Sequence, residues 1–145
     1  MLIGNKFRLY PTKEQQSILR LWIGHQRFIY NAKIQEQDYW FKFYKHSLSL
    51  TGLDHYPDQS YSQFRNSELT PWLNLVPPEI LRNGSYRYIT AYKRFSQGLG
   101  GIPNKKKHFG KQSVMITSEL FSFDENNKNL VIVKSLRIFH LQLFR

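Results

Sequence analysis

Hydrophobic and polar residues alternate along the first stretch of the chain, from Ile3 to Tyr10. A period of two is typical of a strand with one buried face, and here Lys6, Arg8 and Tyr10 fall on the other face. Pro11 ends the pattern because it has no N–H to donate to a neighbouring strand. The sequence therefore predicts a short strand with a basic face.

After Pro11 the apolar residues recur three and four positions apart, which predicts an amphipathic helix. Thr12 and Gln15 form a capping-box pattern, so this helix is expected to begin at Lys13. The helical pattern continues to about Lys45.

A second long helix is expected in the middle of the chain. The residues from Ser49 to Ser60 have the composition of a loop, and a short helix is expected from Ser60 to about Glu68. Pro78 suits the first turn of a helix, and Gly98 suits its end. The apolar residues between them share one face, namely Ile80, Leu81, Gly84, Tyr88, Ala91, Tyr92 and Phe95.

The period returns to two near the end of the chain, where four strands are expected at 114–118, 120–123, 130–134 and 136–144. The first strand has no neighbour close in sequence, so we expect it to pair with these. The predicted fold class is α+β. It has a β part at 1–11 and 112–145, a helical insertion at 12–98, and a basic connection rich in Gly and Lys at 99–111.

The net charge limits the classes of binding partner that the sequence predicts. Among 145 residues, 21 Lys and Arg oppose 10 Asp and Glu, which gives a formal charge of +11. Such an excess attracts polyanions and suits nucleic-acid phosphates or anionic lipid. The chain has no Cys, so disulfides, thiolate nucleophiles and Cys-ligated zinc are excluded. No stretch has the length of a membrane span, and the first residues lack the apolar core of a signal peptide, so an intracellular protein is expected.

Catalytic chemistry is not visible in the sequence. The ten acidic residues are scattered, whereas two-metal chemistry needs several carboxylates that converge on the ions. The five His show no metal-ligand spacing, and no phosphate-binding loop or nucleophile elbow is present. No catalytic residue, metal or cofactor is therefore expected. A small metal-dependent nuclease remains an alternative.

Nucleic-acid binding explains the basic segments better. The stretch "NKKKHFGK", from Asn104 to Lys111, combines four Lys with Phe109. Lysines suit phosphates, and an aromatic ring can stack on an unpaired base. The alternative for each segment is a solvated face. The candidate binding residues are Lys6, Arg8, Tyr10, Arg20, Arg27, Asn31, Lys33, Arg82, Arg87, Lys93, Lys105, Lys106, Lys107 and Lys111.

The motifs resemble those of one family. "KFRLYPTKEQQSILRLWIGHQRFIYN" resembles the opening of the OrfB/TnpB family of insertion-sequence proteins, with its K-x-R-x-Y-P-T strand. The family's G-x-x-R-x-x-Y-N pattern falls on Gly24, Arg27, Tyr30 and Asn31. "WLNLVPPEILRNGSYRYITAYKRF" and "GIPNKKKHFGKQSVMIT" are similar to later segments of the family. Asn104 and Lys105 depart from its usual aromatic-lysine pair.

The resemblance implies more than the composition does. TnpB-like proteins are RNA-guided DNA endonucleases related to type V CRISPR effectors, and their N-terminal part is also described as a helix-turn-helix transposase domain. In that part, a wedge-type β-barrel is interrupted by a helical recognition bundle. It holds the scaffold of the guide RNA and contacts target DNA. The resemblance implies a prokaryotic cytoplasmic protein that is associated with the nucleoid when bound to DNA.

The family's RuvC-like nuclease and four-cysteine zinc ribbon lie further along than Arg145. This chain is therefore expected not to cut DNA itself. Its expected partners are structured guide RNA, double-stranded DNA, and a second copy or a full-length family member. A protein-interaction fragment that associates with an intact family member remains a further alternative.

Overall fold

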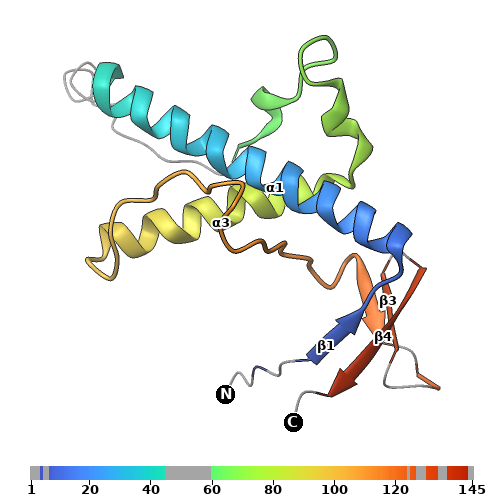
Figure 1. The fold of residues 1–145 in the computed structure, drawn as a ribbon. Coiled ribbons are helices and arrows are strands. Elements are labelled where there is room, and N and C mark those ends of the chain that lie inside the picture. The colour runs from blue at the N-terminus through green and yellow to red at the C-terminus, as the bar shows by residue number, and fades with distance from the viewer. Residues whose placement is uncertain are drawn as a thin grey trace. The chain divides into compact units, whose positions relative to one another are not determined.

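The computed structural model describes residues 4, 7–44, 60–123, 125–126, 130–133 and 137–143, drawn as a ribbon in Figure 1. These residues divide into two compact units: Met1–Leu21 with Ile116–Arg145, and Trp22–Met115. The boundary between the units falls inside the first long helix. Each unit is described separately below.

The first unit contains an antiparallel sheet of four strands. They are β1 (Phe7–Tyr10), β2 (Phe121–Phe123), β3 (Leu130–Val133) and β4 (Arg137–Leu143). The order in the sheet is β1-β4-β3-β2. β1 lies against β4, with Phe7 opposite Leu143 and Tyr10 opposite His140.

The prediction of a wedge-type β-barrel is wrong. The strands form an open sheet, in which β1 and β2 occupy the two edges and are not hydrogen-bonded to each other. The described strands have only three to seven residues. Strands this short leave few ladder bonds with which to close a barrel, and most of the regular structure described is helical.

The strand expected at 114–118 is also absent, because this stretch has no regular secondary structure. The alternation of apolar and polar residues there has another cause. Residues 114–117 are all partly buried, and the backbone of Met115 is hydrogen-bonded to a side chain of the second unit rather than to a strand. A row of apolar residues is typical of a strand, but the backbone N–H of Met115 donates to a side chain and not to a neighbouring strand.

The first long helix, α1 (Lys13–Tyr39), begins where its capping box predicts. The Thr12 N–H donates to Gln15 Oε1 at 2.8 Å, and the Gln15 N–H donates to Thr12 Oγ1 at 3.3 Å. These two bonds satisfy backbone donors that the first helical turn cannot. The helix continues into a π-helical turn, η1 (Trp40–Tyr44), close to the expected end.

The second unit is helical. The short 3₁₀ turns η2 (Ser62–Phe64) and η3 (Pro71–Leu75) precede the second long helix, α3 (Pro78–Ser96). The expected helix from Ser60 to Glu68 is therefore only the single turn η2. α3 has Pro78 at its first position and ends at Ser96, and Gly98 follows its C-cap with a φ of 72°, a left-handed conformation that favours glycine.

The core of this unit lies between the part of α1 after Leu21 and α3. α3 buries the face that the sequence predicts, including Ile80, Leu81 and Tyr88. Tyr30 and Ile34 of α1 form one cluster with Tyr88 and Ile89 of α3. Arg82, Tyr86 and Lys93 lie on the exposed face of α3.

The two helices approach each other closely at Gly84. A Cβ atom built on this residue would lie 2.8 Å from the backbone oxygen of Gln26 and 3.2 Å from the Ile29 side chain. Only glycine leaves room for this contact. The approach positions the α1 residues that form the candidate site.

Candidate nucleic-acid interface

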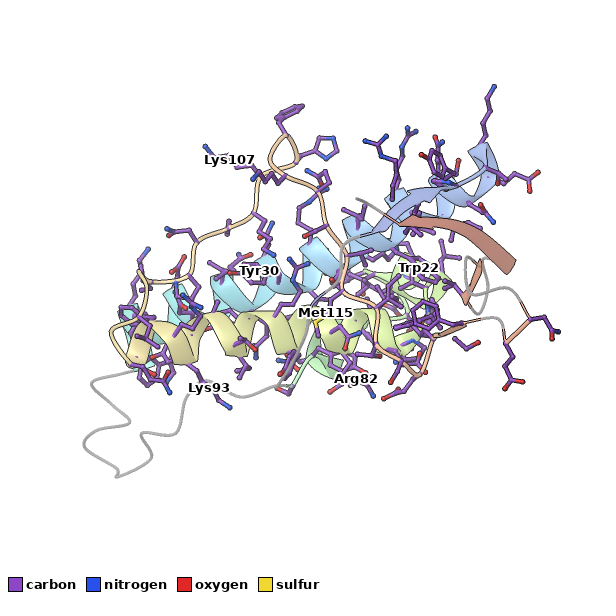
Figure 2. The ribbon with its side chains drawn as sticks, turned by 90° about the horizontal axis from the view of Figure 1, so that it is seen from below. Trp22, Tyr30, Arg82, Lys93, Lys107 and Met115 are labelled. Carbon is purple, nitrogen blue, oxygen red and sulfur yellow. The ribbon has the colours of Figure 1, made fainter. Side chains whose placement is uncertain are left out.

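The basic segment 104–115 lies against one face of α1 (Figure 2). Arg27, Tyr30 and Asn31 present this face because residues three and four positions apart are neighbours on a helix. In Figure 2, Lys107 projects from the segment, while Met115 lies back against the two helices. The motif residues of α1 therefore hold the segment that carries the lysines.

Asn31 fixes the segment at Lys106. The Asn31 Nδ2 donates to the Lys106 carbonyl at 3.0 Å, and the Lys106 N–H donates to Asn31 Oδ1 at 2.7 Å. A side-chain amide that binds both backbone groups of one residue fixes that residue's position and orientation. Asn31 therefore positions the segment through its side-chain amide.

Asn31 holds the backbone of Lys106. The Lys106 ammonium lies above the Tyr30 ring, with Nζ 4.4 Å from the ring centroid. This distance is in the range of a cation–π interaction. Partial burial and, to a smaller extent, the nearby positive charge of Arg87 together lower the pKa of Lys106 to about 8. A negative ligand at this position would favour the charged form of the lysine.

Arg27 fixes the segment at a second position. Its guanidinium donates to Gln112 Oε1 at 2.9 Å and lies 3.1 Å from His108 Nδ1. The Gln112 side chain in turn donates to the carbonyls of His108 and Gly110. A tight turn, in which the Gly110 N–H donates to the Lys107 carbonyl at 3.3 Å, completes the arrangement. The turn is therefore held by three side chains.

Gln26 anchors the end of the segment. Its amide nitrogen donates to the carbonyls of Ile80 and Met115, at 2.9 and 3.0 Å. Its amide oxygen accepts the Met115 N–H at 2.7 Å and Arg87 Nη1 at 3.1 Å. All four hydrogen bonds of the buried amide are thereby made. Gln26 connects α1, α3 and the segment through one side chain.

Arg87 of α3 binds the segment as well. Its guanidinium donates to the Ser113 carbonyl at 3.2 Å and to Ser113 Oγ at 2.9 Å. Arg87 is thereby oriented by two elements, α1 and the segment, while it remains partly exposed. A guanidinium held in this way is prepared to bind an anion with its remaining donors.

These side chains surround a small open cavity of about 20 Å³. That volume holds about one water molecule, so a ligand could place a single oxygen atom there but not a whole phosphate. Five of the lining residues are basic and none is acidic; the full set is Ile23, Gln26, Arg27, Tyr30, Arg87, Lys106, Lys107, Lys111, Gln112 and Ser113. We call this cavity and its lining the cationic notch.

A larger hollow of about 420 Å³ adjoins the notch and shares Tyr30, Arg87 and Lys106 with it. Arg94 and the exposed ring of Tyr86 also line this hollow. The positive surface is therefore continuous along α3, from Arg94 to the notch. Its shape suits an extended anion better than a compact one.

The structure does not place every candidate residue at this site. The prediction that Lys33 contacts nucleic acid is wrong, because its side chain is fully buried and its ammonium pairs with Glu36 at 2.8 Å. Its Nζ also lies about 6 Å from the ring centroids of Phe64 and Tyr88. A buried charge needs such a partner, so Lys33 is a packing residue.

The other candidates remain predictions. Arg8 and Tyr10 are exposed on β1, and Lys6 lies outside the described residues. Arg20 is exposed on the part of α1 that belongs to the first unit. Two further candidates, Arg82 and Lys93, are exposed on α3 but do not line the notch. The exposed Lys105 lines a separate hollow of about 510 Å³, together with Phe28, Tyr39 and Phe64.

Sequence reasoning missed Gln26, Gln112 and Ser113, which hold the notch together. Gln26 did carry a signal, because it is a polar residue at a position of α1 that the helical period places toward the core. Gln112 and Ser113 carried none, because an amide or hydroxyl in a polar loop is ordinary.

The described part of the chain has a positively charged notch on a helical unit, and positively charged surfaces are typical of nucleic-acid-binding proteins. The model of the OrfB/IS605 helix-turn-helix domain matches residues 1–45 and supports an N-terminal region of this type, with a DNA-binding, transposase-associated role. In the structure, the described part of these residues forms β1, α1 and η1. No curated protein matches the chain.

In the described part of the chain, no group of three or more His, Cys, Asp or Glu could hold a metal ion. None of the described helices is long and apolar enough to cross a membrane.

Proposed function

We propose that the chain is the nucleic-acid-binding N-terminal module of a TnpB-like, RNA-guided DNA endonuclease. In this proposal it binds the phosphate backbone of structured guide RNA and of double-stranded target DNA. It takes no part in bond cleavage. The match of residues 1–45 supports the DNA-binding part of this proposal, and the cationic notch supports the phosphate binding.

The observation that carries the proposal is the convergence of five basic side chains on one cavity without a carboxylate. Like charges that are held close together raise the free energy of the folded state, and an anion relieves this repulsion. The repulsion is visible at Lys106, whose pKa the Arg87 charge helps to lower. A phosphate oxygen at the mouth of the notch would receive hydrogen bonds from guanidinium and ammonium groups together.

The shape of the positive surface indicates a polymer. The notch admits one oxygen atom, and the adjoining hollow continues past Arg87 to Arg94. Successive phosphates of one strand could therefore be bound in turn. Exposed lysines suit this role because they hold a phosphate without requiring a particular base.

The test is a salt series with variants of two exposed lysines that line the notch. Each phosphate contact contributes a slope of about −0.9 to the plot of log affinity against log salt for duplex DNA. We expect the double variant Lys107→Ala, Lys111→Ala to bind hairpin RNA and duplex DNA more weakly, with a slope smaller by about 2. The matched control is Lys42→Ala, which removes an exposed lysine of η1 outside the notch.

Equal slopes for the double variant and the wild type would contradict the proposal at this site. A loss of equal size in the Lys42→Ala control would show that only net charge matters. Tighter binding to a structured RNA than to duplex DNA at the same salt would support the guide-RNA role. The opposite preference would contradict it and leave the DNA-binding role.

The absence of catalysis is tested separately. We expect plasmid DNA and RNA to remain intact after incubation with the chain and Mg²⁺ or Mn²⁺. Cleavage that one acidic substitution abolishes would overturn this part of the proposal in favour of a small nuclease.

A further inference from the structure

Phe109 is almost fully exposed, with 96% of its surface open to solvent. It lies within the tight turn that Lys107 and Gly110 close. Single exposed apolar residues are common on protein surfaces, so exposure alone indicates nothing. What distinguishes Phe109 is that the turn around it is fixed.

Three contacts hold this turn in place. The Arg27 guanidinium lies at the His108 ring, and the Gln112 amide donates to the carbonyls on both sides of Phe109, those of His108 and Gly110. The His108 ring also packs edge-on against Phe109, with ring centroids 5.1 Å apart and planes at 75°. The backbone that presents the exposed ring is therefore ordered before any ligand binds. This lowers the entropic cost of using the ring in binding.

The surroundings of the ring are positive. Lys107 and Lys111 flank the turn and line the cationic notch, and no acidic residue occurs between Gly98 and Ser118. A partner that places an apolar face on the ring must therefore also carry negative charge. A nucleotide does both, because its base has an apolar π-face and its phosphate is an anion.

We propose that Phe109 stacks on an unpaired base of the nucleic acid whose backbone lies in the cationic notch. A base inside a duplex is already stacked on both faces, so the ring has access only to a base in a bulge, a loop or an end. The proposal rests on the proposed function, since it needs the phosphate backbone at the notch. It adds a preference for unpaired bases that lysines alone cannot supply.

The experiment compares two hairpins that differ in one bulged nucleotide, each made as RNA and as DNA. Every hairpin is closed by the same non-nucleotide linker, so that neither has unpaired loop bases. The bulged base is 2-aminopurine, whose fluorescence reports stacking. We expect Phe109→Ala to weaken binding to the bulged hairpin by about 5- to 150-fold, the range for one stacked base. Binding to the fully paired hairpin should change by less than about twofold. Phe109→Trp should retain the preference and the fluorescence change.

The matched control is Leu69→Ala, which removes an apolar side chain that is 79% exposed in the same unit and lies outside the notch. It should leave both affinities unchanged. If Phe109→Ala lowers the affinity for both hairpins equally or for neither, the stacking proposal is wrong. The proposal of phosphate binding at the notch is then unaffected. If the wild-type chain binds neither hairpin, the proposed function fails together with the stacking. If the preference for the bulged hairpin occurs with RNA, the stacked base belongs to RNA. If it occurs with DNA, the stacked base belongs to DNA.

Discussion

At the scale of single residues, Lys106 is the most informative group of the site. Its backbone is held by Asn31, its ammonium lies over Tyr30, and burial is the main cause that lowers its pKa to about 8. Most lysines stay charged up to about pH 10. The charge of Lys106 therefore changes at a lower pH than is usual for a lysine side chain.

The first prediction concerns the pH dependence of binding. A phosphate at the notch favours the charged lysine, so we expect affinity for hairpin RNA to fall as the pH rises through about 8. Binding near this pH should be accompanied by proton uptake, which calorimetry in two buffers of different ionisation enthalpy measures. Lys106→Arg stays charged throughout this range and should remove the pH dependence. An unchanged pH profile in this variant would contradict the role of Lys106.

The same pKa predicts an effect on folding with the opposite sign. Between about pH 8 and pH 10.5 the unfolded chain binds a proton at this lysine that the folded chain has lost. Stability therefore rises with pH across this window, through this group. The contribution is unfavourable below about pH 8, where both states carry the proton.

Gln26 gives the second prediction. Replacing it by Leu keeps the size of the side chain but removes the acceptor of the Met115 N–H and of Arg87. Leaving such groups without a partner costs about 1–3 kcal/mol each when they are buried. We expect Gln26→Leu to lower the free energy of unfolding by about 2 kcal/mol or more, measured by urea denaturation. The control Gln35→Leu, at an exposed position of α1, should change it by less than about 0.5 kcal/mol.

Residue types alone could not separate the binding cations from the structural ones. Lys33 and Lys107 are the same type of residue in different environments. Glu36 and two aromatic rings surround the Lys33 side chain, whereas Lys107 is exposed. The i, i+3 spacing of Lys33 and Glu36 was a signal of this pairing. The partners of Arg27 lie more than 80 residues away, so no local pattern could predict them.

At the scale of elements, the local signals were reliable where they concerned helix ends. The capping box of Thr12 and Gln15, the Pro at position 78 and the Gly at position 98 all act as the sequence predicts. These signals depend on backbone groups within one turn of the residue. The strand expected at 114–118 failed because the partner of Met115 is a distant side chain, which periodicity does not reveal.

The third prediction compares two glycines in the two long helices. At Gly84 a new Cβ would meet the Gln26 backbone oxygen at 2.8 Å, so Gly84→Ala should lower the free energy of unfolding by about 1–3 kcal/mol. At Gly24 nothing lies within 4 Å of a new Cβ. Gly24→Ala should therefore raise it by roughly 0.5–1 kcal/mol, because alanine favours the helix. Thermal denaturation by circular dichroism distinguishes the two; destabilisation of equal size at both positions would contradict the close approach.

At the scale of the whole molecule, the charge predicted a polyanionic partner, nucleic acid or anionic lipid, but not the fold. The value of +11 follows from composition, whereas an open sheet and a closed barrel can have the same strands. The difference depends on which strand edges pair, and this depends on contacts between residues far apart in the sequence. The pairing of β1 with one of the C-terminal strands was predictable because β1 has no strand nearby in sequence, but the sequence did not single out β4.

The fourth prediction concerns the intact chain. A polyanion that binds only the folded state stabilises it by mass action, by about 2.7 kcal/mol at a concentration of 100 times its Kd. We expect a 20-nucleotide hairpin to raise the melting temperature at 50 mM salt. The increase should disappear at 500 mM salt, where phosphate contacts are weakened. An increase that is unaffected by salt would indicate binding through apolar surface instead.

The hydrogen bond from the Met115 N–H to the Gln26 side chain has a consequence for hydrogen exchange. An amide in a stretch without helix or strand is normally expected to exchange with solvent within seconds to minutes. This amide is held by a residue of the core, so it can open only when α1, α3 and the segment separate. Met115 should therefore exchange as slowly as the centre of α3, although it belongs to no regular element. Rapid exchange there, with α3 protected, would mean that the segment detaches from the helices on its own.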